Sequence, residues 1–363
     1  MLAASAFLLL VVDPFMVTRV GFQLSYLAVT GIVLLFKPLC NLLVVPVVLL
    51  DKVWQLSVVS LAATLATFPL SLYYFHQFPN LFLLTNLVAI PASFLILYNG
   101  ILLLVFSAAP PIAHALGYTF RLVLSALGRA VGFLEGLPFS TTTGVYLSTS
   151  QLMLLMGLLV SMVILFLSRR KGHLWFMLIL GLLLSVSVIW RKYGSLRQSH
   201  MVVYSIRGHT ALEFIQGKRS VFVCDSGLLL DPKKILYATS GFRLQQGITH
   251  TSVHALEDGD ITTPWFRRMG SLFFFGGHLL VLVDDNADLY RDTLFMKPDW
   301  VLLCNKPQTS LQKLSEVFLF DTLLMDGSMP PWEKERWVSA CREEGFEFHD
   351  LSENGAYLHS GLK

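Results

Sequence analysis

The chain has 363 residues, of which 54% are hydrophobic and only 14% are charged. A soluble domain is about one quarter charged, so this composition excludes a chain that is soluble throughout and indicates an integral membrane protein, at least in part. Residues 1–198 contain eleven Lys or Arg and three acidic residues, a balance of +8, and the net charge of +3 for the whole chain leaves −5 for residues 199–363. We therefore expect a basic membrane domain over residues 1–198 and an acidic soluble domain over residues 199–363.

The first apolar run, residues 2–12, is too short to cross a bilayer, which takes about 20 residues. We interpret it as the end of a helix whose beginning is missing from the chain. No basic segment precedes the run and no small-residue cleavage site follows it, which argues against a cleavable signal peptide.

Further apolar runs predict membrane spans at residues 20–36, 53–75, 152–167 and 174–190. The run at 39–50 contains Pro46 and is too short to cross, so we expect a re-entrant or interfacial helix there. Residues 81–108 are interrupted by Asn86, Pro91 and Asn99, which suggests a short helix to Ile90 followed by a span. Basic residues alternate with leucines over 111–137, a pattern typical of an amphipathic helix at the interface. With the partial first helix, this makes about six spans.

The orientation depends on two basic clusters. Arg169, Arg170 and Lys171 lie in a very short loop between two spans, and the positive-inside rule places such loops in the cytoplasm. The domain after Ser199 would then be extracytoplasmic. Arg191, Lys192 and Arg197 follow the last span and argue for the opposite orientation, but we give the shorter loop more weight.

After Ser199 the pattern becomes that of short β-strands separated by turns. Strand-like runs occur at residues 201–206, 211–215, 220–227, 271–277, 279–285 and 299–305. Two helices are predicted at 310–318 and 331–345, the second with Pro331 in its first turn and Gly345 at its C-terminal cap. Strands mixed with helices predict an α/β or α+β domain.

Two ordered segments resemble the signature of the ComEC family of competence DNA-uptake channels. The first is "DPFMVTRVGFQLSYLAVTGI", which carries Asp13-Pro14 and Gly21-Phe22-Gln23-Leu24-Ser25. The second is "LAATLATFPLSLYYFHQFPNLFLLTNLVAIPASF", with Thr67, Pro69, Tyr74-Phe75-His76 and Asn86 to Pro91. The resemblance extends from Met1 to about Trp190. Family members also carry an N-terminal OB-like domain and earlier membrane helices, so the chain resembles the C-terminal part of such a protein.

The soluble half resembles a reduced copy of the metallo-β-lactamase-like domain that ends many family members. "SVFVCDSG" is similar to an early strand of that fold, and "SENGAYLHS" is similar to its closing strand. Where metal-binding members carry His-His-Gly-Ser, this chain has Asn305-Lys306-Pro307-Gln308, and it lacks the His-x-His-x-Asp-His motif. We therefore expect no bound metal, no cofactor and no nuclease activity. His250 and His254 lie near acidic residues, but without a supporting motif an exposed polar segment is the better interpretation.

The resemblance implies a component of the inner-membrane channel that brings one DNA strand into the cell during natural transformation. The chain contains no phosphate-binding loop of the G-x-x-x-x-G-K-[ST] kind, so energy would have to come from another protein. The expected partners are single-stranded DNA, the lipid bilayer and other competence proteins including a motor, and a homo-oligomer is compatible with the sequence. Two alternatives are a small-solute permease and a membrane-anchored metal-dependent hydrolase.

Polar residues within apolar segments usually face a bundle interior or a watery path. The candidates for the DNA path are Arg19, Gln23, Ser25, Asn86 and Asn99. Each also has a purely structural interpretation: Arg19 can reach lipid headgroups, and an amide can bond a neighbouring backbone. Structural roles are expected for the remaining motif residues, which are Asp13, Pro14, Gly21, Phe22, Pro69 and Pro91. Asp13 and Pro14 would start a helix. Outside this set, Gly31 is expected to let two helices pack closely.

Overall fold

The computed structural model describes residues 1–168, 172–284 and 297–360. The chain forms two compact units, Met1–Val188 and Ile189–Lys363. The basic loop at residues 169–171 lies outside the described residues, so the orientation inferred from it stays a prediction.

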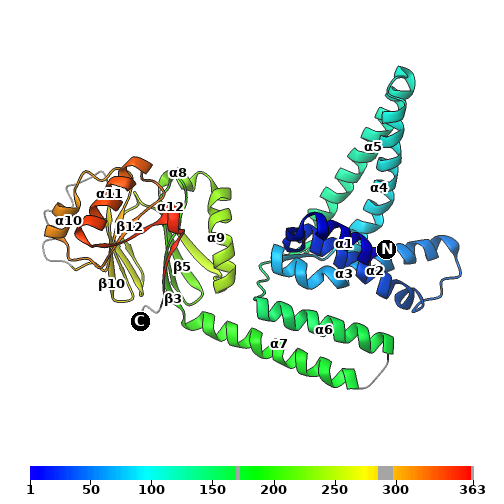
Figure 1. Cartoon of the computed structure of the whole chain (residues 1–363), viewed down its shortest axis with the longest axis horizontal. Helices are drawn as coiled ribbons and strands as arrows, with labels where there is room; N and C mark the ends of the chain where they lie inside the picture. The colour runs from blue at the N-terminus through cyan, green and yellow to red at the C-terminus, as the bar shows by residue number, and fades with distance from the viewer. Residues whose placement is uncertain (169–171, 285–296, 361–363) are drawn as a thin grey trace. The chain divides into compact units, whose positions relative to one another are not determined.

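The first unit is helical (Figure 1). Its described residues also include the short antiparallel strands β1 and β2, which pair with each other. Five helices in the described part of the chain are long and apolar enough to cross a membrane, namely α2, α3, α4, α6 and α7, whereas α1 has only 11 residues. In chain order the elements are α1 (Leu2–Val12), η1 (Pro14–Thr18), α2 (Val20–Cys40), α3 (Val48–Phe75), β1 (Gln77–Pro79), α4 (Phe82–Val105), α5 (Pro110–Glu135), β2 (Thr141–Thr143), α6 (Thr149–Ser168) and α7 (Gly172–Arg197).

Helices α2 and α3 approach each other closely at Gly31. A Cβ atom on Gly31 would lie 2.4 Å from the Cβ of Ala66 and 2.6 Å from the carbonyl oxygen of Ala62. Small residues let two membrane helices approach until their backbones are nearly in contact, which replaces the hydrophobic drive that is absent within lipid. The expectation that Gly31 packs closely is therefore confirmed.

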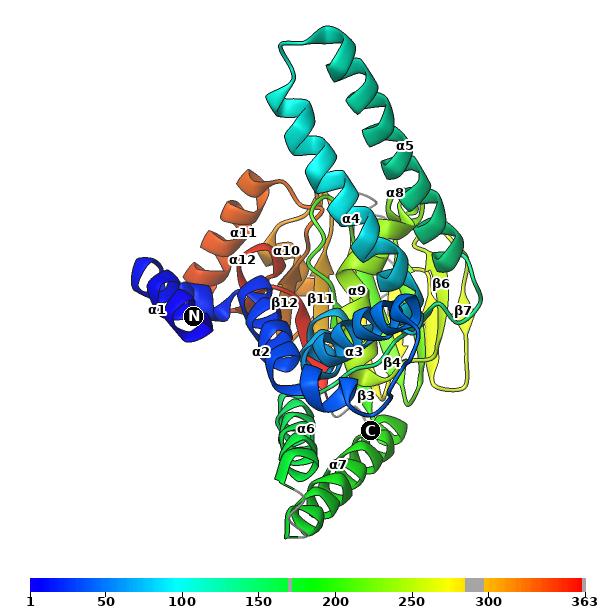
Figure 2. The same ribbon diagram turned by 90° about the vertical axis from the view of Figure 1, so that its right-hand side faces the viewer.

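Two helix predictions in this unit are wrong. Residues 39–50 form no helix of their own, because α2 continues to Cys40 and α3 starts at Val48. The proline at 46 disfavours a helical conformation of the residue before it, which explains the irregular stretch between the two helices. Residues 82–105 form one helix rather than two, since α4 continues through Pro91. Helix α5 follows it and lies beside it in both views (Figures 1 and 2).

The second unit is an α/β domain built on two sheets. The smaller sheet has the strand order β14-β3-β4-β5-β6, and the larger sheet has the order β13-β12-β11-β10-β9-β8-β7. Strands β5 and β6 are parallel, as are β10 to β13, and the other pairs are antiparallel. The strands are β3 (Ser199–Val203), β4 (Ala211–Gln216), β5 (Arg219–Cys224), β6 (His250–Ala255), β7 (Ile261–Thr262), β8 (Phe266–Met269), β9 (Leu272–Phe275), β10 (His278–Val283), β11 (Trp300–Leu303), β12 (Thr322–Met325), β13 (Glu347–Asp350) and β14 (Tyr357–Ser360).

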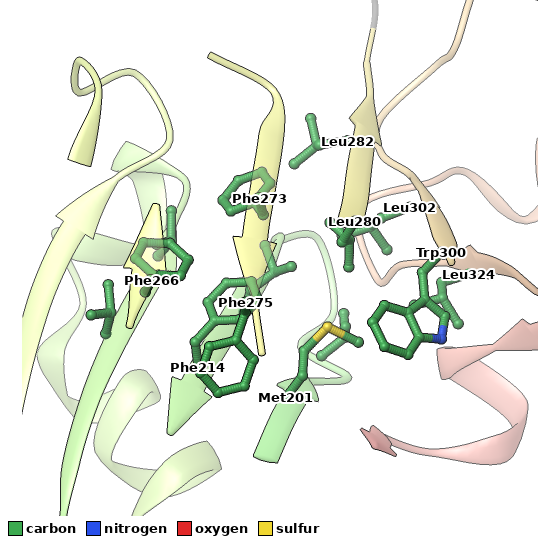
Figure 3. Close-up of a cluster of buried hydrophobic side chains, with 14 of the residues drawn as sticks. Met201, Phe214, Phe266, Phe273, Phe275, Leu280, Leu282, Trp300, Leu302 and Leu324 are labelled. Carbon is green, nitrogen blue, oxygen red and sulfur yellow. The ribbon is translucent and has the colours of Figure 1, made fainter. Parts of the chain in front are cut away.

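The main hydrophobic core lies between the two sheets. Met201 and Phe214 of the smaller sheet meet Phe273 and Trp300 of the larger one (Figure 3). The ring centroids of Phe214 and Phe273 are 5.7 Å apart in a stacked arrangement. Alternate residues of the central strands, such as Met201 and Val203 of β3 or Leu280 and Leu282 of β10, point into this layer, as strand geometry requires.

Helices cover the outer face of each sheet. Figure 1 shows α8 and α9 outside the smaller sheet and α10 and α11 outside the larger one, which makes four layers in the order helix, sheet, sheet, helix. The helices are α8 (Ser226–Leu229), α9 (Pro232–Gln246), α10 (Leu311–Val317), α11 (Pro331–Glu344) and α12 (Leu351–Asn354).

The helix boundaries of the second unit follow local cap chemistry. Helix α11 begins at Pro331 and ends before Gly345, which has φ +76°, so both predicted boundary signals are confirmed. Helix α9 was not predicted, although Asp231 caps its first turn and Gly247, with φ +69°, ends it. Ile235, Ala238 and Phe242 face the sheet at helical spacing, but the exposed residues Leu236 and Tyr237 are also apolar and conceal the helical period.

Candidate functional site

The polar residues of the first motif bond mainly to one another and to the helix ends around them. The Asp13 carboxylate accepts a hydrogen bond of 3.0 Å from the Phe15 backbone and one of 2.8 Å from the Arg19 guanidinium. Pro14 is the first residue of η1, as expected after a capping aspartate. Arg19 remains 64% exposed, so its charge is only partly covered by this pair.

Gln23 connects the two motif-bearing segments. Its Nε2 donates to the Val17 carbonyl at 2.8 Å, and its Oε1 accepts a hydrogen bond of 3.0 Å from the Tyr74 hydroxyl on α3. Both ends of the amide therefore have protein partners. Two neighbours on the helix behave differently, since Ser25 is exposed and Gly21 has no atom within 4 Å of the place its Cβ would occupy.

The two asparagines of α4 occupy different environments. The Asn99 amide nitrogen donates to the Thr119 hydroxyl of α5 at 2.6 Å, while its oxygen is buried without a partner among the described residues. Asn86 is half-buried, and its side chain makes no hydrogen bond to any residue that the structure describes. No hydrogen bond joins Asn86 to Gln23 within that part of the chain.

The other motif residues have packing roles in the structure. The Phe22 ring lies against that of Tyr26, with centroids 4.4 Å apart. Pro69 is buried inside α3, and Pro91 lies inside α4 without ending it.

A second candidate site lies in the α/β unit, at the carboxyl ends of strands from both sheets. A cavity of about 240 Å³ opens there, lined by Asp225 after β5, Asp284 after β10 and Cys304 after β11. Ligands of α/β proteins bind at this edge, because loops that follow parallel strands meet there. Asp225 belongs to the "SVFVCDSG" segment, but it was not among the residues predicted to form a site.

Asp326, which follows β12 and is completely buried, supports the cavity from behind its lining residues Thr210 and Ser328. Its carboxylate accepts hydrogen bonds from the Thr210 hydroxyl, from the Ser328 backbone at 2.9 Å and from the Ser328 hydroxyl at 2.6 Å. Burial raises the pKa of the Asp326 carboxyl, although these hydrogen bonds act in the opposite direction. The Ser328 oxygen in turn accepts from the Asn305 backbone at 2.7 Å.

The Asp225 carboxylate also accepts several hydrogen bonds from within the protein. One of its oxygens accepts from the Leu228 backbone and from His209, each at 2.9 Å, and the other accepts from the Thr210 backbone at 2.9 Å. The first of these bonds caps α8. The carboxylate therefore already has three protein donors and holds together the end of β5, the start of α8 and the chain at His209.

These residues do not fit the zinc ion that a lactamase-like fold implies. A catalytic zinc needs three converging ligands and an open position, but the carboxylates of Asp225 and Asp326 are taken up by internal donors. Burial raises the pKa of the Cys304 thiol well above its usual value, and the neighbouring Asp326 adds to the effect, so the thiolate that binds metals is disfavoured. Over residues 1–168, 172–284 and 297–360, no group of three or more His, Cys, Asp or Glu is placed to hold a metal ion.

Arg268 closes one wall of the cavity and is only 4% exposed. Its guanidinium donates to the carbonyls of Ala255, Leu256 and Gly270 and lies 5.4 Å from the Phe273 ring centroid. Every acceptor is a backbone oxygen, so the arginine fixes the loops around the cavity. Sequence reasoning missed this residue, because its role depends on carbonyl positions that no motif encodes.

A larger hollow of about 920 Å³ adjoins the cavity through Gly208 and Ser328. Lys334 lines it, and its ammonium is bonded to Asp350 at 3.0 Å and to the Ser352 hydroxyl at 2.5 Å. Close packing between the two hollows depends on Gly327, where a Cβ would lie 2.2 Å from the Ile206 carbonyl oxygen. Sequence reasoning missed this corner, for which the Asp-Gly-Ser turn at residues 326–328 after an apolar run is the available signal.

Comparison with known protein families gives two matches along the chain. Residues 1–172 match the family model described as Competence protein. Residues 201–360 match the model described as ComEC C-terminal domain. No curated protein and no solved structure matches the chain significantly.

Proposed function

The chain belongs to the ComEC family of competence proteins, and we propose that it forms part of the inner-membrane channel that admits one DNA strand during natural transformation. The five long apolar helices among the described residues support a membrane protein, and its family suggests a role in DNA uptake. The DNA strand would pass along the face of the first unit that presents Asn86.

The observation that carries this proposal is the state of the Asn86 side chain. It lies in α4, a candidate span with no charged residue, and it makes no hydrogen bond to any residue in the described ranges. An amide left facing hydrocarbon is costly, so the side chain needs a polar partner from outside these residues. Water and a passing strand of DNA both supply donors and acceptors that an amide can bond in turn.

The same reasoning separates Asn86 from Gln23. Because the Gln23 amide is bonded at both ends, it supports the wall of the path rather than contacting DNA. Arg19 is exposed and paired with Asp13 through one nitrogen, so it can still attract phosphate at the mouth of the path.

Transformation with chromosomal point variants tests the proposal. Asn86→Leu should reduce the transfer of DNA into the cytoplasm severalfold while DNA binding at the cell surface is retained. Leu84→Asn is the matched control, because residue 84 lies on the other side of α4 at nearly the same depth. Normal transformation by the Asn86→Leu strain, at a normal level of protein in the membrane, would refute the proposal.

For the second unit we propose a lactamase-like fold that has lost its metal and acts without nuclease activity. The four-layer arrangement and the occupied carboxylates of Asp225 and Asp326 support this. Metal analysis of the purified full chain tests it: less than stoichiometric zinc and no nuclease activity are expected, and one firmly bound zinc per chain would overturn it.

We also propose that the second unit lies outside the cytoplasm, and that a separate motor protein, with or without a second copy of this chain, completes the machine. An impermeant maleimide should label Glu343→Cys on α11 in intact cells, because that residue is exposed. Labelling only after permeabilisation would mean that the second unit lies in the cytoplasm and would contradict the proposed orientation.

A further inference from the structure

Helix α9 carries large apolar residues on its outer face as well as on the face that packs against the sheet. Ile235, Ala238 and Phe242 pack inward on the cluster beneath the helix. On the other side Tyr237 is 91% exposed and Leu236 is 64% exposed. A helix at an ordinary water-exposed surface has a polar outer face, so this second apolar face requires an explanation.

Leu230 and Lys233 extend this exposed face toward α8. Leu230 follows α8 directly and is 87% exposed, and Lys233 is exposed in the first turn of α9. We call Leu230, Lys233, Leu236 and Tyr237 the outer face of α9. A mixture of leucine, tyrosine and lysine is the composition of helices that lie at the boundary of a membrane.

The C-terminal end of α9 is fixed to the end of α7. The Gln198 side chain, one residue after α7, donates to the Gln246 carbonyl of α9 at 2.8 Å and to the Gly217 carbonyl at 2.7 Å. A Cβ on Gly247 would lie 3.7 Å from that of Ser195. Because these contacts belong to one compact unit, the last turns of α7 and the end of α9 form a single packed joint.

The last turns of α7 carry the residues that mark a membrane surface. Trp190 is 79% exposed and Tyr193 is 53% exposed, and the basic residues Arg191 and Lys192 lie between them. Tryptophan and tyrosine concentrate at the headgroup level of membrane helices. Ser195 follows Trp190 by five residues, or about 8 Å along the helix, so the joint with α9 lies close to that level.

The direction of α9 completes the geometry. Figure 1 shows α9 lying across the direction of the last turns of α7, on the side from which α7 enters the second unit. A bilayer crossed by α7 therefore meets the outer face of α9 along its length rather than at its tip. The turn between β4 and β5 is bonded to Gln198 through the Gly217 carbonyl, and the exposed basic residue Arg219, the first of β5, follows this turn.

We propose that the outer face of α9 rests in the headgroup layer of the same bilayer that α7 crosses. Leu230, Leu236 and Tyr237 enter the boundary of the acyl chains, and Lys233 meets lipid phosphate. The contact fixes the height of the α/β unit above the membrane. It also holds the carboxyl-end cavity near the bilayer, because Asp225, which lines the cavity, precedes α8 directly.

Depth-dependent fluorescence quenching of the full chain in lipid nanodiscs tests the proposal. Cys40 is replaced by serine, since the other three cysteines are buried. A nitrobenzoxadiazole label is then placed at Tyr237→Cys, or at Glu343→Cys on α11, which covers the opposite face of the unit. Lipids with a spin label at the headgroup or at the fifth acyl carbon should quench the label at 237 at least about twofold more than the label at 343.

Two further measurements identify what covers the face. Lys233→Glu should lower the quenching at position 237 in nanodiscs that contain anionic phosphatidylglycerol, because the phosphate contact is lost. Equal quenching at positions 237 and 343 would overturn the proposal. Efficient disulfide formation between two Tyr237→Cys chains would also overturn it, since a second copy would then cover the face.

Discussion

The Tyr74 hydroxyl of α3 donates a hydrogen bond of 3.0 Å to Oε1 of Gln23 on α2. Because Gln23 also donates to the Val17 carbonyl, its amide links the entry of α2 to the far end of α3. The two sequence motifs of the membrane unit are thus joined through one side chain. The close contact at Gly31 lies farther along the same pair of helices.

Two substitutions separate the parts of this link. Tyr74→Phe removes one uncharged hydrogen bond and should cost about 1 kcal/mol of stability. Gln23→Leu leaves both the Tyr74 hydroxyl and the Val17 carbonyl without their partner, so it should lower the apparent melting temperature in detergent further. Equal melting temperatures for the two variants would contradict the described bonds.

The Gly31 contact leads to a sharper stability prediction. Gly31→Ala should strongly reduce the amount of folded protein, because its new methyl group would overlap Ala66 and the Ala62 carbonyl and force α2 and α3 apart. Gly21→Ala on the same helix is the control, since nothing lies within 4 Å of its Cβ position. Size-exclusion profiles of both proteins in detergent are the measurement, and a normal profile for Gly31→Ala would contradict the close packing.

Asp326 should be important for the stability of the α/β unit. Asp326→Ala leaves the Thr210 and Ser328 donors unsatisfied inside the protein and should cost about 1–3 kcal/mol. Asp321→Ala, at an exposed position just before β12, should change stability little. Protease resistance of the unit within the full chain compares the two, and equal resistance would argue against the hydrogen-bond network.

Acidic pH should destabilise β14, an edge strand of the smaller sheet. Burial lowers the pKa of His359, and the neighbouring His278 lowers it further, while Asp299 acts in the opposite direction. His278 is itself hydrogen-bonded to Asp299 at 2.7 Å, and the His359 ring lies 4.7 Å from that of Trp300.

The sign of this effect follows from the lowered pKa. In the unfolded chain His359 becomes protonated near the ordinary histidine pKa of about 6.5. In the folded chain its pKa is lower, so at the same pH its imidazole is still mostly neutral. The stabilising contribution is therefore complete above that value and is lost as the pH falls through the lower folded pKa. The protection factors of the β14 amides, which are corrected for the slower intrinsic exchange in acid, should fall between neutral and mildly acidic pH, and fall less in His359→Gln. If His359→Gln left the pH response unchanged and His250→Gln on β6 removed it, the acid effect would arise from His250 and not from His359.

The sequence predicted the class of each half better than the details. Long apolar runs and alternating strand patterns are local signals, so the spans and six strands of the α/β unit could be found from them. The irregular stretch before Val48 and the continuous helix through Pro91 depend on which competing local preference prevails in the packed unit. Helix α9 was missed because its exposed face is apolar, which conceals the usual helical period.

The candidate sites were predicted only in part. Asp13 and Gln23 could be recognised as unusual polar residues, but the tyrosine that bonds Gln23 lies 51 residues away. The network around Asp326 brings together Thr210 and Ser328, which are separated by more than a hundred residues. Such contacts follow from the pairing of two sheets, and spacing along the chain carries no signal for them.

Site-specific photocrosslinking to DNA arrested during uptake tests the central claim most directly. A benzophenone amino acid at position 86 should crosslink to incoming single-stranded DNA, because Asn86 faces the proposed path. The same amino acid at position 84, where Leu84 is 53% exposed on another side of α4, should crosslink to lipid or to protein instead. Selective crosslinking at 86 is the predicted result. Absence of DNA crosslinks at 86, in cells that still transform, would contradict the account, as would equal DNA crosslinking at both positions.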